Sequence, residues 1–241
     1  MAGTLFISDL HLANDRPEIV QLFIKFLDQR ASHASQLYIL GDLVEYWLGD
    51  DDPAEGLEPA FDAMKQCADR GLQIFLMHGN RDFLMGETFA RRSGCQLIQD
   101  PYIANLNGVP ALLMHGDTLC TDDLRYQQLR LMLRNPAWQA DFLSKPLAER
   151  TEMARALREQ SKDETQLKDE AIMDVNPQAV NQAFQQHGVR LMIHGHTHRP
   201  DIHSFELDQE SVQRIVLGDW YNSGSYLELA PDNSFSLKAF D

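Results

Sequence analysis

The chain has 241 residues, of which 44% are hydrophobic and 24% are charged, which is typical of a globular protein with at least one sizeable core. Its net charge of −15 opposes binding of the chain as a whole to nucleic acid or to an anionic surface. Three widely spaced cysteines and the lack of a signal segment or a long apolar run predict a cytoplasmic protein without disulfides or a membrane span.

The first third of the chain alternates short apolar runs with segments of helical spacing. Residues 4–7, 37–40 and 74–77 are apolar runs of strand length, and polar residues follow each of them. Between these runs, Pro17 opens one predicted helix, and residues 57–70 carry the spacing of a second. The order strand, helix, strand, helix, strand is typical of an α/β fold.

Residues 122–168 interrupt this pattern with a segment that is almost wholly helical and is broken by Pro136 and Pro146. Residues 124–168 contain nine Lys and Arg against six Asp and Glu, so basic charge is concentrated here. One interpretation is an ordinary amphipathic hairpin that packs on the sheet, and the other is a cap that faces an anionic, partly apolar ligand. We expect one domain, residues 1–241, with this segment as an insertion within it.

The rest of the chain predicts one more helix and several strands. Asn176 and Pro177 should begin a helix that runs to about His187. Four later runs have the alternation or apolar character of strands and are separated by glycines and a turn. We expect these runs to pair as a second, mainly antiparallel sheet: residues 202–205, 214–217, 226–229 and 235–237.

Side chains that can bind a metal ion follow the three apolar runs described above and two further predicted strands, residues 111–114 and 191–193. Open α/β sheets gather working residues at the carboxyl ends of their strands, so we expect these side chains to lie together. His194, His196 and His198 occupy every second position and would face one side of an extended chain, while Gly195 permits a close approach. His194 could line the site or be structural. The candidate metal ligands are Asp9, His11, Asp42, Asn80, His115, His196 and His198.

Seven ligands are too many for one tetrahedral zinc ion and suit two divalent ions, which in such pairs lie about 3.5–4 Å apart. Asp42 is the natural bridge between them, because a carboxylate has two oxygens. Imidazole mixed with oxygen ligands favours Mn, Fe or Zn over Mg alone. The predicted chemistry is hydrolysis of a phosphate ester or anhydride by a water that the two ions activate.

The motifs that carry these ligands resemble, in their order, those of the calcineurin-like metallophosphoesterase superfamily. They are Asp9-Leu10-His11, Gly41-Asp42, Gly79-Asn80-Arg81-Asp82, His115-Gly116-Asp117 and Gly195-His196-Thr197-His198. The resemblance covers nearly the whole chain and implies a four-layer αββα sandwich of two mixed β-sheets flanked by helices. It also implies that one ion is held by Asp9, His11, Asp42 and His198, and the other by Asp42, Asn80, His115 and His196.

Within this superfamily, the sequence resembles the UDP-2,3-diacylglucosamine pyrophosphatases, peripheral hydrolases of lipid A synthesis in Gram-negative bacteria. The resemblance lies in residues 6–12, 38–42, 77–83, 113–117, 193–200 and 218–220. It implies two Mn²⁺ ions, release of UMP and a diacylglucosamine 1-phosphate (lipid X), and a helical insertion that covers the acyl chains. The implied location is the cytoplasmic side of the inner membrane, and we expect a monomer. The implied substrate contacts are Asn80, Arg81, Asp123, Ser161, Thr165, Lys168 and His196.

Arg81 departs from the wider superfamily, in which many phosphatases have a histidine at this place. Arginine cannot donate a proton near neutral pH, but it can hold a diphosphate through two hydrogen bonds. The alternative is a salt bridge from Arg81 to Asp82. We expect Asp42, Asn80, Arg81 and His196 to be the catalytic residues, with Arg81 and His196 stabilising charge on the phosphorus.

Two other functions are compatible with the sequence. The first is a broad phosphodiesterase, or another nucleoside-diphosphate-sugar hydrolase, of the same superfamily, which an uncapped polar site would favour. The second is a non-enzymatic scaffold with the same fold, which the presence of all seven ligands opposes. Two further expectations concern aspartates: Asp117 should orient a ligand histidine, and residues 50–52 should form a solvated loop.

Overall fold

The computed structural model describes residues 3–166 and 174–241, and the side chains of residues 3–158 and 174–241. Its strands are β1 (Thr4–Ile7), β2 (Gln36–Leu40), β3 (Gln73–Met77), β4 (Gln96–Ile98), β5 (Tyr102–Leu106), β6 (Val109–Met114), β7 (Leu191–His194), β8 (Asp201–Leu207), β9 (Glu210–Val216), β10 (Gly224–Leu229) and β11 (Phe235–Phe240). Its α-helices are α1 (Pro17–Gln29), α2 (Glu58–Asp69), α3 (Glu87–Ser93), α4 (Leu124–Leu133), α5 (Pro136–Leu143), α6 (Leu147–Gln166) and α7 (Pro177–His187). Two 3-10 turns, η1 (Ala31–His33) and η2 (Asp117–Leu119), complete the set.

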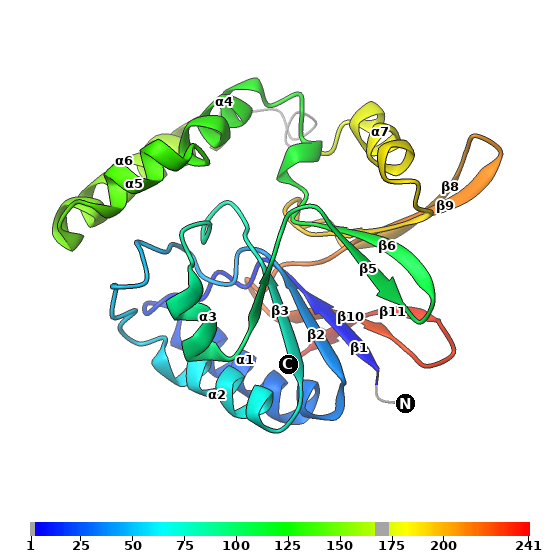
Figure 1. Ribbon diagram of the computed structural model, residues 1–241, viewed down its shortest axis with the longest axis horizontal. Coiled ribbons are helices and arrows are strands. Elements are labelled where there is room, and N and C mark those ends of the chain that lie inside the picture. Colours follow the sequence, from blue (N-terminus) through cyan, green and yellow to red (C-terminus); the bar gives the residue numbers. More distant parts are fainter. Residues whose placement is uncertain (1–2, 167–173) are drawn as a thin grey trace.

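The strands form two mixed sheets (Figure 1). The first has the order β11-β10-β1-β2-β3-β4, in which β1 to β4 are parallel and β10 and β11 are added antiparallel. The second has the order β5-β6-β7-β9-β8, with β6, β7 and β9 parallel and an antiparallel strand at each edge. The expectation of two mixed sheets is therefore confirmed.

Successive side chains of a strand point to opposite faces of its sheet, and this alternation produces four layers. In β1, Leu5 and Ile7 belong to the apolar cluster under α1 and α2, whereas Phe6 belongs to the cluster between the two sheets. On the outer face of the second sheet, residues of β6 and β7 pack against Val180 and Phe184 of α7. Both faces of each central strand are buried, which explains their continuous apolar runs. The αββα sandwich follows from this arrangement.

The helices predicted from spacing are present. The structure has α1, α2 and α7 where Pro17, residues 57–70 and Asn176 indicated them. The Asn176 side chain accepts hydrogen bonds from the Gln178 and Ala179 backbone N–H groups, as expected of a helix cap. The pattern did not predict α3, β4 or β5, because these elements are short and lack a clear period.

The prediction for the C-terminal strands was wrong. The strands do not form a sheet of their own: β8 and β9 join the second sheet, whereas β10 and β11 extend the first. The pairing of β10 with β1 places Leu227 and Leu229 in the core between the sheets. The alternation of residues predicts that a hairpin is present, but it does not predict which sheet edge the hairpin pairs with.

The insertion consists of α4, α5 and α6, with Pro136 at the start of α5 and α6 beginning after Pro146. Figure 1 shows these helices as a group apart from the helices that cover the sheets. Phe142 of α5 is 3% exposed and joins the same apolar cluster as Trp47 and Leu84, so the insertion packs on the sandwich. None of the described helices is long and apolar enough to cross a membrane.

The loop that was expected to be solvated is structured by its aspartates. Asp50 accepts hydrogen bonds from the backbone N–H groups of Gly86, Thr88 and Phe89 at the start of α3. Asp51 pairs with the buried Arg150 of α6. The Asp51 side chain is 65% exposed, so the loop lies at the surface as expected, but a helix N-terminus and an arginine also bind its aspartates.

Candidate metal centre

The loops at the carboxyl ends of five strands meet between the two sheets. Asp9 and His11 follow β1, Asp42 follows β2, Asn80 follows β3 and His115 follows β6, while the loop after β7 carries His196 and His198. The structure brings all seven predicted ligands together through the contacts given below: Asp9, His11, Asp42, Asn80, His115, His196 and His198.

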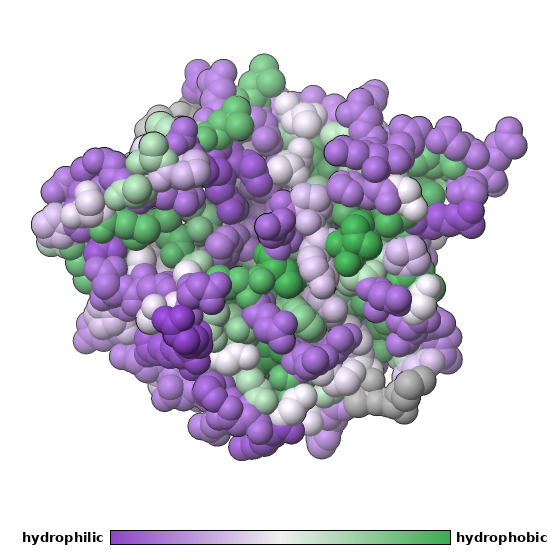
Figure 2. Space-filling view, in the orientation of Figure 1, coloured by the Kyte–Doolittle hydropathy of each residue, from purple (hydrophilic) through white to green (hydrophobic). Residues whose placement is uncertain are grey.

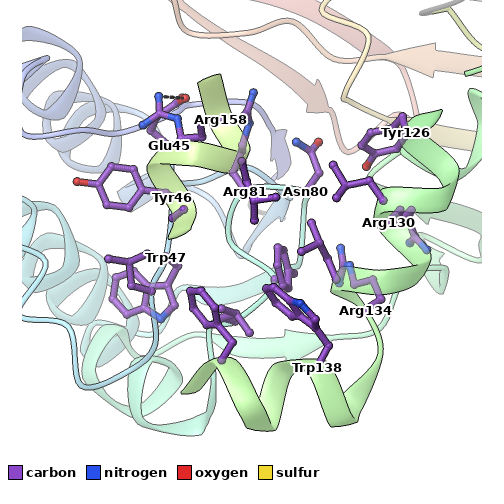
Figure 3. Close-up of a pocket in the computed structure, with 18 residues that line it drawn as sticks. Glu45, Tyr46, Trp47, Asn80, Arg81, Tyr126, Arg130, Arg134, Trp138 and Arg158 are labelled. Atoms are coloured by element: carbon purple, nitrogen blue, oxygen red, sulfur yellow. Dashed lines mark hydrogen bonds and ion pairs between the residues drawn. The ribbon is translucent and has the colours of Figure 1, made fainter. Parts of the chain in front are cut away.

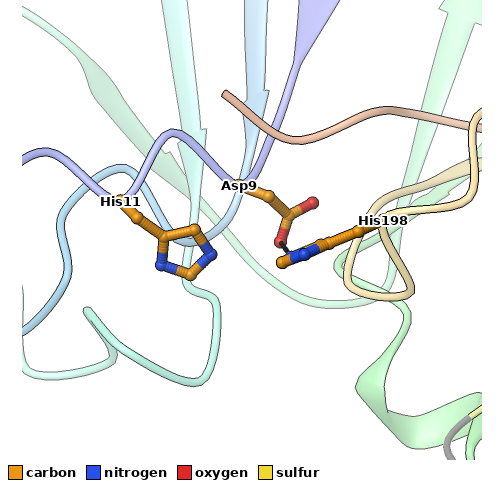
Figure 4. A group of neighbouring side chains, drawn as sticks. All are labelled: Asp9, His11 and His198. Atoms are coloured by element: carbon orange, nitrogen blue, oxygen red, sulfur yellow. Dashed lines mark ion pairs between the residues drawn. The ribbon is translucent and has the colours of Figure 1, made fainter. Parts of the chain in front are cut away.

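The first half of the centre contains Asp9, His11 and His198 (Figure 4). One potential ligand atom from each of them lies within 4.8 Å of the others. Asp9 Oδ2 accepts hydrogen bonds from Ser8 Oγ at 2.6 Å and from His196 N at 2.9 Å. The second oxygen, Asp9 Oδ1, is buried without a hydrogen-bond partner among the described residues and lies 3.4 Å from His198 Nε2. This oxygen is available to a cation.

The second half contains three atoms that can each donate a lone pair. Asn80 Oδ1 lies 2.9 Å from His115 Nε2 and 3.0 Å from His196 Nδ1, and the two ring nitrogens are 3.2 Å apart. Two ligands at right angles around an ion about 2.1 Å from each are separated by about 3 Å. The spacing of this triangle therefore fits one face of the coordination shell of a divalent cation.

A backbone carbonyl group determines which ring nitrogen of His115 carries the proton. Its Nδ1 donates to the Leu40 carbonyl oxygen at 2.9 Å, so in the neutral ring Nε2 carries the free lone pair. Burial lowers the pKa of His115, but the charges of Asp42 and Asp9 outweigh burial and raise it to about 9. A histidine pKa raised in a fully buried place indicates that the carboxylates attract positive charge to this point.

Asp42 lies between the two halves. Its Oδ1 accepts a hydrogen bond from the Arg81 backbone N–H at 2.8 Å. Its Oδ2 lies 3.8 Å from His11 Nε2 and 3.9 Å from His115 Nε2, so it faces one histidine of each half. The geometry fits a carboxylate that bridges two ions.

Five of the seven candidate ligands have a left-handed backbone conformation. The φ angles are 56° at Asp9, 49° at His11, 53° at Asp42, 68° at His196 and 55° at His198. Such φ values are uncommon for residues other than glycine and cost on the order of 1–3 kcal/mol each. Conformations of this kind concentrate at functional sites, where the surrounding structure enforces them.

Glycines allow the loops to approach one another this closely. A Cβ atom at Gly195 would lie 2.3 Å from Ser8 Oγ and 2.4 Å from Asp9 Oδ2, and one at Gly79 would lie 2.2 Å from Asp42 Oδ1. Any side chain at either place would displace a carboxylate that belongs to the candidate ligand set. The role expected for Gly195 is consistent with these distances.

His194 and Asp117 have different surroundings from the metal candidates. His194 is fully buried, with Nδ1 2.9 Å from the Gly195 carbonyl oxygen and Nε2 3.1 Å from Arg214, which is a structural environment. Asp117 Oδ2 accepts hydrogen bonds from Tyr126 at 2.6 Å and from Arg130 at 2.7 Å. Within the described part of the chain no histidine hydrogen bonds to Asp117, so the expectation that it orients a ligand histidine was wrong.

One face of α4 attaches the insertion to the metal-binding loops. Tyr126, Arg130 and Arg134 are four residues apart and therefore lie on the same side of the helix. The first two bind Asp117, and Arg134 Nη2 donates to the Gly79 carbonyl oxygen at 2.8 Å, one residue before Asn80. Sequence analysis missed these residues because their i, i+4 spacing has meaning only once the partner loop is known.

Two of the predicted substrate contacts, Asn80 and His196, belong to the metal centre, and the other five divide into three groups. Arg81 lines a pocket beside the centre, and the alternative pairing with Asp82 is not present, since the Asp82 carboxylate accepts from the Leu43 and Gly79 backbone N–H groups at 2.7 Å each. Asp123 is the N-cap of α4, where its side chain accepts from the Tyr126 N–H. Ser161 and Thr165 fall in the part of α6 whose side chains lie outside the described set, and Lys168 lies outside the described residues.

A pocket opens from Asn80 and Arg81 toward the insertion (Figure 3). It lies between the loop after β2 and the helices α4, α5 and α6, and its volume is about 870 Å³ when the space open to solvent is included. Its apolar wall is formed by Leu48, Phe83, Leu84, Leu129, Leu133, Trp138, Phe142 and Leu157. Four arginines also line it: Arg81, Arg130, Arg134 and Arg158. The pocket therefore combines an apolar chamber with positive charge at its end near the metal centre.

The comparisons with known proteins agree with this site. A protein of Stenotrophomonas maltophilia named UDP-2,3-diacylglucosamine hydrolase is 50% identical over 233 residues, which cover 94% of this chain and 94% of that protein. Proteins of the same name from Pseudomonas paraeruginosa (50% over 227 residues, 94% and 95% covered) and Marinobacter nauticus (49% over 235 residues, 98% and 96% covered) are similarly close. The model of the calcineurin-like phosphoesterase family matches residues 3–200. The chain belongs to the calcineurin-like phosphoesterase family.

Proposed function

We propose that this protein hydrolyses the diphosphate of UDP-2,3-diacylglucosamine with two Mn²⁺ ions and releases UMP and 2,3-diacylglucosamine 1-phosphate. Relatives about 50% identical over nearly their full length are named for hydrolysis of this substrate. The ligand set supports a metal-dependent reaction, since it mixes imidazole and oxygen atoms as Mn²⁺ sites do. The second candidate function is a broader phosphodiesterase, which would use the same metal centre on substrates that have no acyl chains.

The observation that carries the proposal is the pocket beside the metal centre. A diphosphate placed against Asn80 and Arg81 would leave two acyl chains directed at the apolar wall under α4, α5 and α6. Burying an acyl chain there is favourable by about 0.8 kcal/mol for each CH₂ group. The helical insertion, residues 122–168, is thus proposed to be a cap that covers the lipid part of the substrate.

We assign the ions to the two halves of the centre: Asp9, His11, Asp42 and His198 would hold one, and Asp42, Asn80, His115 and His196 the other. When bound, the ions supply activation of a water and neutralisation of charge on the phosphoryl oxygens. Burial and the charge of His115 lower the pKa of His196 to about 3, so this ring is neutral at pH 7 and can serve as a ligand.

The protein groups near the diphosphate have distinct proposed roles. The Arg81 guanidinium would donate to the phosphoryl oxygens, and it stays charged while the leaving group departs as a phosphate that needs no proton. The Arg81 backbone N–H meanwhile holds Asp42 in its bridging orientation. We propose that His196 also contacts substrate, as do Asp123, Ser161, Thr165 and Lys168 of the cap.

The position of cleavage can be tested with isotopically labelled water. Turnover of UDP-2,3-diacylglucosamine in H₂¹⁸O should place ¹⁸O in UMP, because we propose attack at the α-phosphorus. Label in the lipid phosphate instead would contradict the proposed attack at the α-phosphorus. As a matched substrate, the analogue without acyl chains should turn over at least tenfold more slowly at low concentration, since it cannot use the apolar chamber.

We also propose that the protein is a cytoplasmic monomer that binds the inner membrane peripherally through the outer side of the cap. All seven candidate ligands come from one chain, so the site needs no second copy. On α4, Leu124, Leu131 and Met132 are 69%, 73% and 44% exposed and lie on one helical face. Figure 2 shows apolar side chains at the surface along the helices of the insertion. Exposed apolar residues beside basic ones favour contact with an anionic bilayer.

Cosedimentation with phosphatidylethanolamine–phosphatidylglycerol vesicles tests the membrane surface. The double variant L124E/L131E should lose most vesicle binding, and high salt should weaken binding of the unchanged protein. Ile103, which is 43% exposed on β5, provides a matched control. If I103E reduced binding as strongly as L124E/L131E, the assignment of this face would be wrong.

A further inference from the structure

Glu45 contacts the metal centre and the helical insertion at the same time. Its Oε2 lies 3.0 Å from His11 Nδ1, and its Oε1 accepts a hydrogen bond from Arg158 Nη2 at 2.6 Å. Arg158 belongs to α6, and Figure 3 shows its contact with Glu45 at the side of the pocket. One carboxylate therefore joins a candidate metal ligand to Arg158, which lies 113 residues from Glu45 in the sequence.

The backbone holds Glu45 in this position. The His11 N–H donates to the Asp42 carbonyl and the Leu12 N–H donates to the Leu43 carbonyl, each at 3.0 Å. The Glu45 N–H returns to the Leu12 carbonyl, also at 3.0 Å. The two loops thus run side by side, which places the Glu45 carboxylate next to the His11 ring.

The two ring nitrogens of His11 face different groups. Nδ1 faces Glu45, whereas Nε2 faces Asp42 Oδ2 at 3.8 Å and the interior of the metal centre. The ring is 2% exposed and stacks on Tyr221 with centroids 5.4 Å apart and planes 6° apart. A carboxylate beside one nitrogen of a ligand histidine keeps the proton there and leaves the lone pair of the other nitrogen for the metal.

Arg158 fixes the other side of the Glu45 carboxylate. Its side chain is 43% exposed, so the ion pair by itself adds little to stability. The guanidinium also lies 5.5 Å from the centroid of the Tyr46 ring, next to Glu45 in the sequence. The effect of the pair is therefore on geometry and not on stability: the orientation of the Glu45 carboxylate that faces His11 depends on where α6 lies.

We propose that Glu45 is a positioning residue that holds His11 in its metal-binding orientation, and that Arg158 of α6 acts on the metal centre through Glu45. The proposal rests on the proposed function, because it assumes that His11 is a ligand. It follows that the seating of the cap and the affinity of one metal ion depend on each other, since a coupling between two sites is reciprocal.

The test is a Mn²⁺ titration of chelator-treated protein, with free Mn²⁺ followed by electron paramagnetic resonance. The unchanged protein should bind two ions. E45A should weaken one of them by about 10–100-fold and leave the other unchanged, as is usual for the loss of a carboxylate behind a ligand histidine. E45Q should recover most of the affinity, since its amide oxygen can accept a hydrogen bond from the Nδ1–H group of His11.

The role of Arg158 is tested by combining variants. R158M should weaken the same ion by about threefold, because Glu45 keeps His11 but loses its own anchor. In the E45A background, R158M should have no further effect. R155M is the matched control, since Arg155 pairs with Glu152 on its own helix and should leave both affinities unchanged.

The outcomes separate the two levels of the account. Two ions bound to E45A with unchanged affinity would overturn the proposal, and an additive loss in E45A/R158M would overturn the part played by Arg158. Failure of the unchanged protein to bind Mn²⁺ would instead contradict the proposed function. If circular dichroism shows E45A to be unfolded, R158M against R155M carries the test, because both variants keep Glu45 and His11.

Discussion

Asp42 is the residue on which both halves of the metal centre depend. Its carboxylate is buried, and Oδ2 lies at almost equal distances from a histidine of each half. We expect D42A to lose both ions and nearly all turnover, because neither half keeps a complete set of oxygen ligands. Metal analysis and an activity assay check this, with D69A on the exposed end of α2 as the control. A D42A protein with two ions and the original rate would refute the bridging role.

Asp100 provides a test of pH dependence. Burial and the charge of Asp117 raise its pKa to about 6, and neither carboxylate oxygen has a hydrogen-bond partner among the described residues. Because the pKa of this carboxyl group is higher in the folded chain than in the unfolded chain, the folded chain binds the proton more tightly. Stability is therefore lost as the pH rises from about 4 to about 6 and is not regained above that range.

The variant D100N removes this titration. The free energy of unfolding of D100N minus that of the unchanged protein should therefore be larger at pH 7.5 than at pH 4.5, by on the order of 2 kcal/mol. Urea denaturation of metal-free protein at the two pH values measures the difference. Identical pH dependence in the two proteins would show that the carboxyl group of Asp100 titrates normally.

Single residues also show where sequence reasoning stops. The ligands could be identified because Asp and His next to glycines follow apolar runs, and this pattern is local. Glu45 and Arg158 could not be identified, since each is one of many charged residues and their importance arises from a contact between distant segments. The pairing of Asp51 with Arg150 could not be predicted for the same reason.

At the scale of elements, Arg150 is the anchor of α6. Its buried guanidinium pairs with Asp51 and donates to the carbonyl oxygens of Leu48 and Lys145, the latter at 3.0 Å. We expect R150M to lower the free energy of unfolding by about 2 kcal/mol, because two carbonyl groups lose their donors. The melting temperature should fall by roughly 4–8 °C.

The same variant separates the seating of the cap from the metal centre. R150M should keep both metal ions, since Arg150 touches none of the candidate ligands, while proteolysis near α6 becomes faster. D51N should have a smaller effect, because Arg150 keeps its carbonyl partners and Asp51 is 65% exposed. An R150M protein that is as stable and as resistant to proteolysis as the unchanged protein would contradict the anchoring role.

Elements with a strong local pattern were predictable, and those that depend on partners were not. Pro17 and Asn176 mark helix starts by their own chemistry, so α1 and α7 could be expected near their observed bounds, and the break expected at Pro136 is where α5 begins. The edge that β10 covers depends on the sheet already present, which the alternation of residues within β10 does not encode.

The whole molecule brings an apolar chamber and a cation site to one place. The carboxyl ends of parallel strands from both sheets meet at the candidate ligands, and α4 to α6 close the space beside them. The chain carries a net charge of −15, yet Arg81, Arg134 and Arg158 line this pocket. A locally positive cleft can attract an anionic substrate even to an acidic protein.

The measurement that tests this account most directly is release of UMP from UDP-2,3-diacylglucosamine by chelator-treated protein, with and without added Mn²⁺, beside a generic aryl phosphodiester. We predict fast release that requires Mn²⁺ and little turnover of the diester, because only the lipid substrate fills both the metal centre and the apolar chamber. Equal or faster turnover of the diester would contradict the assigned substrate, and release that is unaffected by removal of metal would contradict the metal centre itself.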